Sequence, residues 1–236
     1  MKHVSSDRRK CLVIIPAFNE AGAILNTVRD IEKNAPSFDY VVINDNSFDG
    51  TREILEENSI NHVDLPINSG IGAAVQTGYL YASRYGYTAA IQVDGDGQHD
   101  AAFLEEMASA LYESDAGMVI GSRFIEKDGF QSTGLRRVGI RFFTGLIKLL
   151  TGAKVTDPTS GMRIVGKDII DIFAFDYPKD YPEPETAVVI LKKGYKIKEI
   201  PVKMKKRETG KSSISPIRSI YYMVKVPLAC ILAAWG

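Results

Sequence analysis

The sequence predicts an α/β fold in which a mostly parallel central sheet is covered by helices on both faces. Short apolar runs rich in β-branched residues alternate with helical patterns through the first 120 residues. Polar clusters follow the first four runs, at the strand ends where parallel sheets bind their ligands. With 236 residues, of which 45% are hydrophobic, the chain is long enough to fill a sizeable core.

Five short apolar runs are expected to be buried strands. They are CLVII (11–15), YVVI (40–43), HVDL (62–65), AAIQV (89–93) and GMVIG (117–121). A further strand is expected near YKIKEIPV (195–202). The clusters that follow the first four runs are, in turn, PAFNE, NDNSFDGT, NSGIG and DGDGQHD.

Helical patterns lie between these runs. Apolar side chains recur at helical spacing in residues 24–31 and 103–111, and residues 70–85 are rich in alanine. Later in the chain, residues 138–152, a stretch after DPTSGMRIV (157–165) and a segment that runs through Lys193 are expected to be helices.

Two polar side chains are expected to cap helices. Asn19 precedes a helix that would start near Ala21, and Asp100 precedes one that would begin at Ala101. Side-chain oxygens of Asn and Asp can accept the free amides of a first helical turn, which makes them suitable caps.

The fourth polar cluster places two carboxylates, Asp94 and Asp96, at the end of an apolar strand. In a tight turn both can reach one cation, and without a cation they would repel each other. With the amide oxygen of Gln98 they form a set of hard oxygen ligands that suits Mg²⁺ or Mn²⁺. The sequence therefore predicts a divalent metal site here, with a solvated acidic turn as the alternative.

Two other uses of this cluster were weighed. An EF-hand calcium loop starting at Asp94 would have Glu105 at its twelfth position, but His99 stands where that loop needs glycine, and a strand precedes it instead of a helix. The EF-hand is therefore rejected. A phosphatase of the haloacid dehalogenase type also has D-x-D after a strand, although Gln98 stands where that family would have Thr or Val. It is kept as an alternative enzyme class.

Seven motifs follow one another along the chain. They are PAFNE (16–20), NDNSFDGT (44–51), N-S-G-x-G (68–72), DGDGQHD (94–100), GSRF (121–124), DPTSGMR (157–163) and R-x-x-G-x-S (207–212). In this order they resemble the family 2 glycosyltransferases of GT-A fold, which is Rossmann-like. Within that family the chain is most similar to the dolichol-phosphate mannosyltransferase and bacterial polyprenyl-phosphate glycosyltransferase branch, over about residues 11 to 213.

The resemblance implies a nucleotide-sugar donor linked to UDP or GDP. The residues of PAFNE would surround the base and ribose, and Asp45 would contact the base edge. For Gly72, tight helix packing is the alternative. The donor-binding positions implied are Pro16, Ala17, Phe18, Glu20, Asp45, Gly72, Asp94, Gly95, Arg207 and Ser212.

In this family the metal ion bridges the two donor phosphates and offsets the charge that builds on the departing diphosphate. The resemblance thus assigns Mg²⁺ or Mn²⁺ to Asp94, Asp96 and Gln98, and it makes Asp96 a catalytic residue.

For a polyprenyl-phosphate acceptor the resemblance implies that no general base is needed, because a phosphate monoester is largely ionised near neutrality. Arg123, Arg136 and Arg137 would hold that phosphate with their guanidinium groups, and Ser160 would lie on the acceptor side. Arg123 is therefore also a candidate catalytic residue.

Two further hypotheses stay open. If the acceptor is a glycan hydroxyl, a carboxylate must take its proton, and Glu185, then Glu183, are the candidates. The chain could also be a nucleotide-sugar binding module without turnover, which would bind the donor and transfer nothing.

The expected organisation is one GT-A domain over residues 1–212, with a donor half at about 11–121 and an acceptor half at about 122–212. An amphipathic helix would follow over 213–236. Residues 181–236 hold eleven Lys or Arg against four Asp or Glu, although the net charge of the chain is zero. This helix is expected to lie on a membrane surface, with packing on the domain or the start of a longer membrane segment as the alternatives.

The ends of the chain bear on where it works. The apolar run CLVII stops at Pro16, which is too short for a signal peptide, and VPLACILAAWG is too short to span a bilayer. Cys11 and Cys230 lack the spacing of a disulfide framework or a metal site. We therefore expect a cytoplasmic protein, peripheral at the inner face of the cell membrane. No nucleic-acid partner is expected, and self-association is left open.

Overall fold

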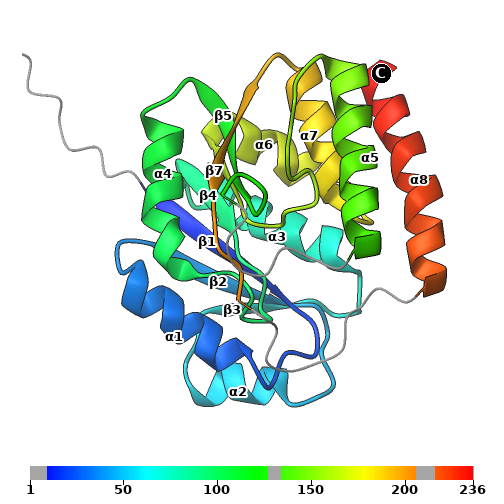
Figure 1. Ribbon diagram of the computed structural model, residues 1–236. Coiled ribbons are helices and arrows are strands. Elements are labelled where there is room, and N and C mark those ends of the chain that lie inside the picture. Colours follow the sequence, from blue (N-terminus) through cyan, green and yellow to red (C-terminus); the bar gives the residue numbers. More distant parts are fainter. Residues whose placement is uncertain (1–9, 127–133, 206–215, 236) are drawn as a thin grey trace, which may run out of the picture.

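A computed structural model describes residues 10–126, 134–205 and 216–235 (Figure 1). Within these residues one seven-stranded sheet has the order β3-β2-β1-β4-β6-β5-β7. The strands are β1 (Cys11–Ala17), β2 (Asp39–Asn44), β3 (His62–Asp64), β4 (Ala89–Gln92), β5 (Ala116–Ser122), β6 (Arg163–Gly166) and β7 (Lys196–Pro201). All six predicted strands are confirmed, and the sheet is parallel except at β6.

Helices cover both faces of this sheet, as predicted (Figure 1). A short 3₁₀ turn, η1 (Ala101–Phe103), precedes α4. The helices are α1 (Ile24–Asn34), α2 (Thr51–Glu57), α3 (Ile71–Arg84), α4 (Leu104–Tyr112), α5 (Gly134–Thr151), α6 (Lys167–Phe175), α7 (Pro182–Lys192) and α8 (Pro216–Trp235).

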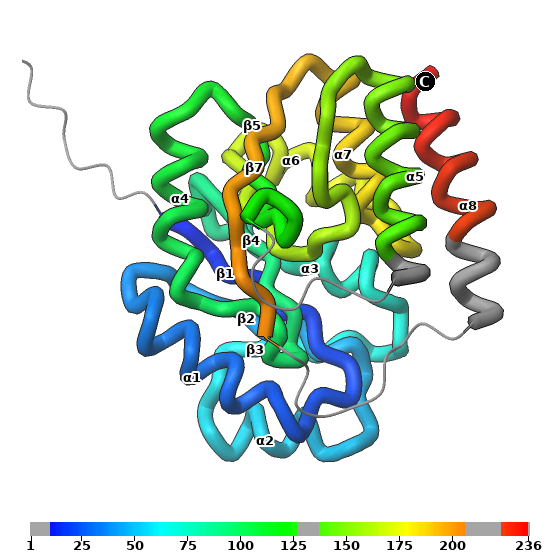
Figure 2. Tube along the Cα trace, in the orientation of Figure 1, coloured from blue at the N-terminus to red at the C-terminus, as the bar shows by residue number. Residues whose placement is uncertain are grey.

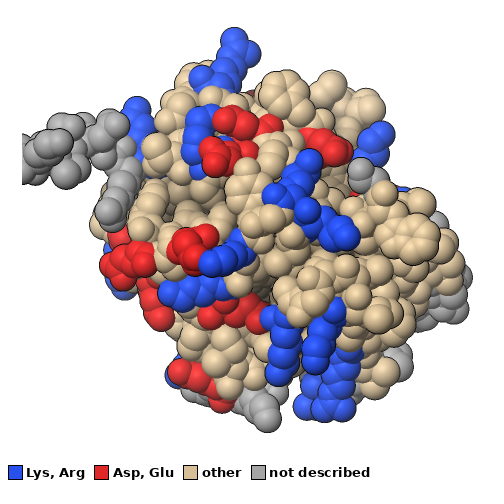
Figure 3. Space-filling view, turned by 90° about the horizontal axis from the view of Figure 1, so that it is seen from above, with Lys and Arg blue, Asp and Glu red and all other residues tan. Residues whose placement is uncertain are grey.

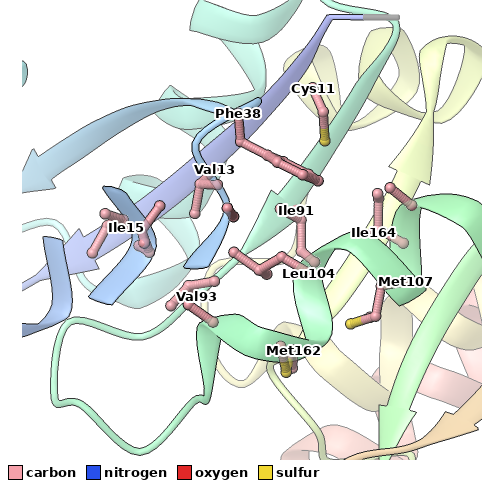
Figure 4. Close-up of a cluster of buried hydrophobic side chains, with 14 of the residues drawn as sticks. Cys11, Val13, Ile15, Phe38, Ile91, Val93, Leu104, Met107, Met162 and Ile164 are labelled. Carbon is pink, nitrogen blue, oxygen red and sulfur yellow. The ribbon is translucent and has the colours of Figure 1, made fainter. Parts of the chain in front are cut away.

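Two hydrophobic clusters fill the core, one on each face of the sheet. Along β1, Val13 and Ile15 face the cluster shown in Figure 4, under α1 and α4, whereas Leu12 and Ile14 face the cluster under α3 and α6. Because both faces are covered, the strand is apolar at consecutive positions, as is typical of parallel sheets.

Two elements were not predicted. Strand β6 lies antiparallel between β4 and β5, and it begins at the last residue of the polar motif DPTSGMR. Its first residue, Arg163, is only 3% exposed, because its guanidinium is bonded to the loop before it and to α7. Helix α2 has seven residues, too few for a clear helical pattern.

The two predicted caps have different outcomes. Asp100 is confirmed, because its side chain accepts the amide of Ala102. Asn19 is wrong as a cap: helix α1 begins at Ile24, and the Asn19 side chain instead accepts the amide of Phe48. Asn19 has a left-handed backbone (φ 57°), and its side chain joins the loop after β1 to the loop after β2.

Helix α8 lies beside α5 and α7 at one flank of the molecule (Figures 1 and 2). Its buried residues Val226, Cys230 and Ala234 belong to the second core cluster. None of the helices in the described ranges has the length and hydropathy needed to span a membrane.

The outer sides of α5 and α8 expose large apolar side chains. We call them the α5/α8 face; they are Val138, Phe142, Leu149, Val224, Leu228, Leu232 and Trp235. The two helices contain no Asp or Glu. From above, the corresponding flank is mostly tan, and Lys and Arg side chains gather beside it (Figure 3).

Candidate active site

The loops after β1 and β2 are joined by hydrogen bonds at the carboxyl ends of their strands. The Asn19 amide donates to Ser47 Oγ at 2.9 Å, and the Phe48 amide donates to Asn19 Oδ1 at 3.0 Å. The Glu20 amide donates to Thr51 Oγ1 at 3.0 Å. The motif PAFNE, predicted to surround the base, is thereby held beside the second polar cluster.

An aromatic pair stands on these joined loops. The Phe18 ring is 41% exposed and packs edge-on against the Phe48 ring, with centroids 5.8 Å apart. Phe48 is 83% exposed. Phe18 was predicted from the sequence, whereas Phe48 was not, although Phe48 lies within the second polar motif.

Asp45 joins the third loop to the first two. Its carboxylate is buried and accepts the amides of Ser69 and Gly70, at 2.7 and 2.8 Å, just ahead of helix α3. Its own amide donates to the Ala17 carbonyl. The donor-binding positions predicted in the first two motifs are therefore brought together, next to the third.

Gly72, by contrast, is explained by packing. Its amide donates to the Lys179 carbonyl at 3.1 Å, and a Cβ at this position would lie 2.2 Å from the Pro178 carbonyl oxygen. Only glycine allows this close approach of two backbone segments.

Hydrogen bonds hold both the side chain and the backbone of Asp94. The Gln92 side-chain amide donates to Oδ1 at 3.0 Å, and the Asp94 amide donates to Nδ1 of the buried His99 at 2.9 Å. Because Nδ1 accepts, a neutral His99 carries its proton on Nε2, which lies 3.7 Å from Asp94 Oδ2. The Asp94 side chain is 38% exposed.

The other two predicted metal ligands lie in the same turn. Asp96 is 9% exposed, and its Oδ1 accepts the Gln98 amide at 3.0 Å across Gly97, which has φ 75°. The Gln98 carbonyl accepts the Lys205 amide at 2.9 Å. A small pocket opens beside this turn; its lining is Asp94, Gln98, His99, Arg123, Thr159, Gly161 and Met204. Carboxylate and amide oxygens next to such an opening fit Mg²⁺ or Mn²⁺.

A compact group of metal-binding side chains lies elsewhere among the described residues. Glu56, His62 and Asp64 bring one ligand atom each within 4.8 Å of one another. Arg52 contacts Glu56 at 2.8 Å and Asp64 at 3.3 Å. The positive charge of this arginine offsets one of the two carboxylates of the group.

Arg123, predicted to hold the acceptor phosphate, lies in a buried ion pair. Its Nε and Nη2 donate to the two oxygens of Asp157 at 2.6 and 2.7 Å, and Nη2 also donates to Thr159 Oγ1 at 3.0 Å. Asp157 is fully buried, and its amide donates to Glu199 at 2.9 Å. The pair fixes the direction of a guanidinium that lines the Asp94 pocket.

A second buried arginine holds the same loop from its other end. Arg163 donates to the Ser160 carbonyl at 2.6 Å, to the Pro158 carbonyl at 2.7 Å and to Thr186 Oγ1 on α7 at 3.0 Å. We call residues 156–163 the Asp157 loop. The predicted acceptor residue Ser160 lies in it, and its buried hydroxyl has no partner among the described residues. Asp157, Thr159, Gly161 and Arg163 were missed as single residues, although they lie in the motif DPTSGMR.

Glu185 lies in the first turn of α7 and is not part of the pocket lining. Burial raises its pKa, the nearby Asp176 raises it further, and Lys225 on α8 opposes the rise. The backbone carbonyl of Glu183 accepts Arg163 Nη1. Both candidate bases are thus parts of the first turn of α7, and neither lines the pocket.

The remaining predicted site residues lie at several places in the chain. Pro16 and Gly95 lie together, since the Gly95 amide donates to the Pro16 carbonyl at 3.3 Å. Arg137 is exposed on α5. Arg207, Ser212 and the side chain of Arg136 lie outside the residues that the structure describes.

Comparisons with known proteins show which family the chain resembles. The family model described as Glycosyl transferase family 2 matches residues 12–173. The chain is 26% identical to polyprenol monophosphomannose synthase of Mycolicibacterium smegmatis, over 97% of this chain and 87% of that protein. It is 26% identical to undecaprenyl-phosphate mannosyltransferase of Micrococcus luteus, over 87% of this chain and 88% of that protein.

Among solved structures, glucosyl-3-phosphoglycerate synthase of Mycobacterium tuberculosis has a TM-score of 0.71 at 15% identity. The likeness covers 97% of this chain and 81% of that one. That structure was solved with Mn²⁺, UDP and glucosyl-3-phosphoglycerate. At this identity the likeness shows a shared fold.

Proposed function

The chain belongs to glycosyl transferase family 2, and on that premise we propose that it transfers one sugar from a nucleotide-sugar to polyprenyl phosphate, with inversion at the transferred carbon. One observation carries this proposal. Asp94, from the donor side, and Arg123, from the acceptor side, line the same pocket. A donor diphosphate and an acceptor phosphate could therefore meet there. Two relatives named for polyprenol or undecaprenyl-phosphate mannosyl transfer support this acceptor class.

On the donor side, the joined loops after β1 and β2 would hold the base between Phe18 and the Asp45 region. The donor would be a sugar linked to UDP or GDP. The tie from Asp45 to the start of α3 supports this role, because it fixes the third loop at the same edge of the sheet. The Asp94 turn would then face the diphosphate.

Asp94, Asp96 and Gln98 would hold Mg²⁺ or Mn²⁺. A bound divalent ion supplies charge neutralisation to a departing diphosphate. The turn itself contributes orientation, because the bond from the Gln98 amide to Asp96 and the bond from Gln92 to Asp94 fix both carboxylates. Gly97 in a left-handed conformation makes this tight turn possible.

On the acceptor side, Arg123 would bind the lipid phosphate, oriented by Asp157, and Arg136, Arg137 and Ser160 would complete that side. A lipid phosphate is an ionised nucleophile, so no side chain has to remove a proton. Glu185, the candidate base for transfer to a hydroxyl, does not line the Asp94 pocket, and this supports a lipid-phosphate acceptor.

We propose further that residues 1–212 form the catalytic domain and that the segment from 213 places the α5/α8 face on the cytosolic surface of the cell membrane. Apolar side chains with Lys and Arg nearby suit an anionic lipid surface, and each basic residue near it contributes about 1 kcal/mol. Such docking would bring a membrane-bound acceptor to the domain. Self-association is left as a further possibility.

Radiolabelled nucleotide-sugars, Mn²⁺ and undecaprenyl phosphate test the proposal, with undecaprenol as the matched acceptor lacking the phosphate. We expect an organic-extractable, acid-labile product with undecaprenyl phosphate and no such product with undecaprenol. Equal transfer to undecaprenol, or transfer only to a water-soluble glycan, would rule out a lipid-phosphate acceptor. Donor binding without any transfer would show a binding module.

A further inference from the structure

Gly161 lies in the Asp157 loop, opposite the Asp94 turn. It is not among the residues with a positive φ, so the backbone there does not require glycine. What glycine provides is room. A Cβ at this position would lie 3.2 and 3.3 Å from the two carboxylate oxygens of Asp94 and 3.2 Å from Nε2 of Gln92. Contacts this short require the neighbouring atoms to move.

The Asp157 loop has little freedom to retreat. Asp157 accepts Arg123, Glu199 accepts the amides of Thr156 and Asp157, and Arg163 donates to two carbonyls of the loop. The carbonyl of Met162 accepts the Gly121 amide of β5 at 2.9 Å. Any crowding from a side chain at Gly161 would therefore fall on Asp94 and Gln92.

Asp94 is also confined on its other side. The buried His99 binds its backbone amide and lies close to Oδ2, and the next residue, Gly95, packs against β1. The carboxylate thus lies between His99 and the bare backbone of Gly161. The space between His99 and the Gly161 backbone therefore determines the position of the carboxylate.

We propose that Gly161 is a positioning residue, whose missing side chain leaves the Asp94 carboxylate in the place where it serves the donor. The same rigid loop carries Asp157, which orients Arg123, so one segment sets a donor-side and an acceptor-side group at a constant separation. The inference rests on the proposed function for its effect on catalysis, and on packing alone for the coupling between Gly161 and Asp94.

Gly161→Ala tests the proposal, with Gly166→Ala as its matched control. Gly166 ends strand β6, which follows the Asp157 loop; its φ is −81°, and the nearest atom to its added Cβ would be 4.0 Å away. We expect Gly161→Ala to lower kcat/KM at least tenfold and to reduce the thermal shift produced by a nucleoside diphosphate with Mn²⁺. Gly166→Ala should leave both unchanged. Unchanged kcat/KM in Gly161→Ala would overturn the proposal.

A double-mutant cycle in urea tests the contact without any assay of transfer. Gly161→Ala should lower the unfolding midpoint in the natural chain, and clearly less in the Asp94→Ala background, where the carboxylate no longer crowds the new methyl group. Strictly additive shifts would overturn the positioning role. If the natural chain transfers no sugar at all, the proposed function fails while the cycle still decides whether Gly161 positions Asp94.

Discussion

The Asp157 loop and the α5/α8 face depart from the usual distribution of side chains in opposite directions. The loop keeps Arg123, Asp157 and Arg163 away from water, and hydrogen bonds satisfy these charges. The α5/α8 face leaves side chains such as Leu232 and Trp235 in contact with water, at 72% and 86% exposure. Burying a charge and exposing a large apolar group both carry a cost in free energy.

The two regions differ in what offsets this free-energy cost. In the Asp157 loop, hydrogen bonds within the molecule offset it, because each buried charge has a partner. The stability of the chain should therefore depend strongly on single bonds of this loop. The α5/α8 face has no such partner within the described chain and would recover its cost only at another surface. Stability measurements should therefore report on the loop, and binding measurements on the face.

Removing one charge from the Asp157 loop should have the largest effect. Asp157→Asn would leave the Arg123 guanidinium buried beside a neutral amide, and breaking a buried pair in this way typically costs about 3–5 kcal/mol. Urea unfolding would measure the change. Asp115→Asn is the control, since Asp115 pairs with Lys196 at the surface, where such pairs contribute about 0–1 kcal/mol. Similar losses in the two variants would contradict this account.

The Asp94 turn should lose ligand binding rather than stability. We expect Mn²⁺ with UDP or GDP to raise the melting temperature of the natural chain. At a ligand concentration a hundred times the dissociation constant, binding stabilises the fold by about 2.7 kcal/mol. EDTA or Asp96→Asn should abolish the rise, while stability without metal changes by less than about 1 kcal/mol. Asp64→Asn, in the compact Glu56, His62 and Asp64 group, should keep it. A loss in Asp64→Asn alone would move the metal site there.

Changing the α5/α8 face should affect binding to lipid and leave the fold unchanged. Leu232→Glu with Trp235→Glu is expected to weaken flotation with anionic vesicles at least tenfold, because two apolar anchors are replaced by charges that the lipid repels. The unfolding free energy should change by no more than about 0.5 kcal/mol. Phe175→Glu, at an 83% exposed site on α6, should float like the natural chain. Equal flotation of all variants would exclude this docking surface.

The comparison also shows what the sequence could predict. The exposed apolar face and the Asp94 turn were anticipated, because α8 is apolar over consecutive residues and the carboxylates are two residues apart. The inner strands were found because both of their faces are covered. These signals lie within short stretches of chain.

The Asp157 loop was recognised as a motif, but its internal arrangement was not. The burial of Arg163 depends on the Glu183 carbonyl and the Thr186 hydroxyl of α7, about 20 residues away. The need for glycine at 161 depends on a carboxylate at position 94. Asn19 was misread for the same reason, since its partner, Phe48, lies in another loop. Contacts between distant segments leave no pattern in a single sequence.

The smallest expected effect concerns Glu185, which lies where α7 meets α8. Burial and Asp176 raise its pKa above the ordinary value of 4.5, so the folded chain binds that proton more tightly than the unfolded chain does. As the pH rises through the interval between the two pKa values, the natural chain therefore loses stability relative to Glu185→Gln. At pH 7 the variant should have a slightly higher melting temperature, with a gain in unfolding free energy of less than about 0.5 kcal/mol. This gain should vanish toward pH 4. Transfer to undecaprenyl phosphate should be retained, whereas its loss, with the fold intact, would show that the Glu185 carboxylate takes part in the reaction.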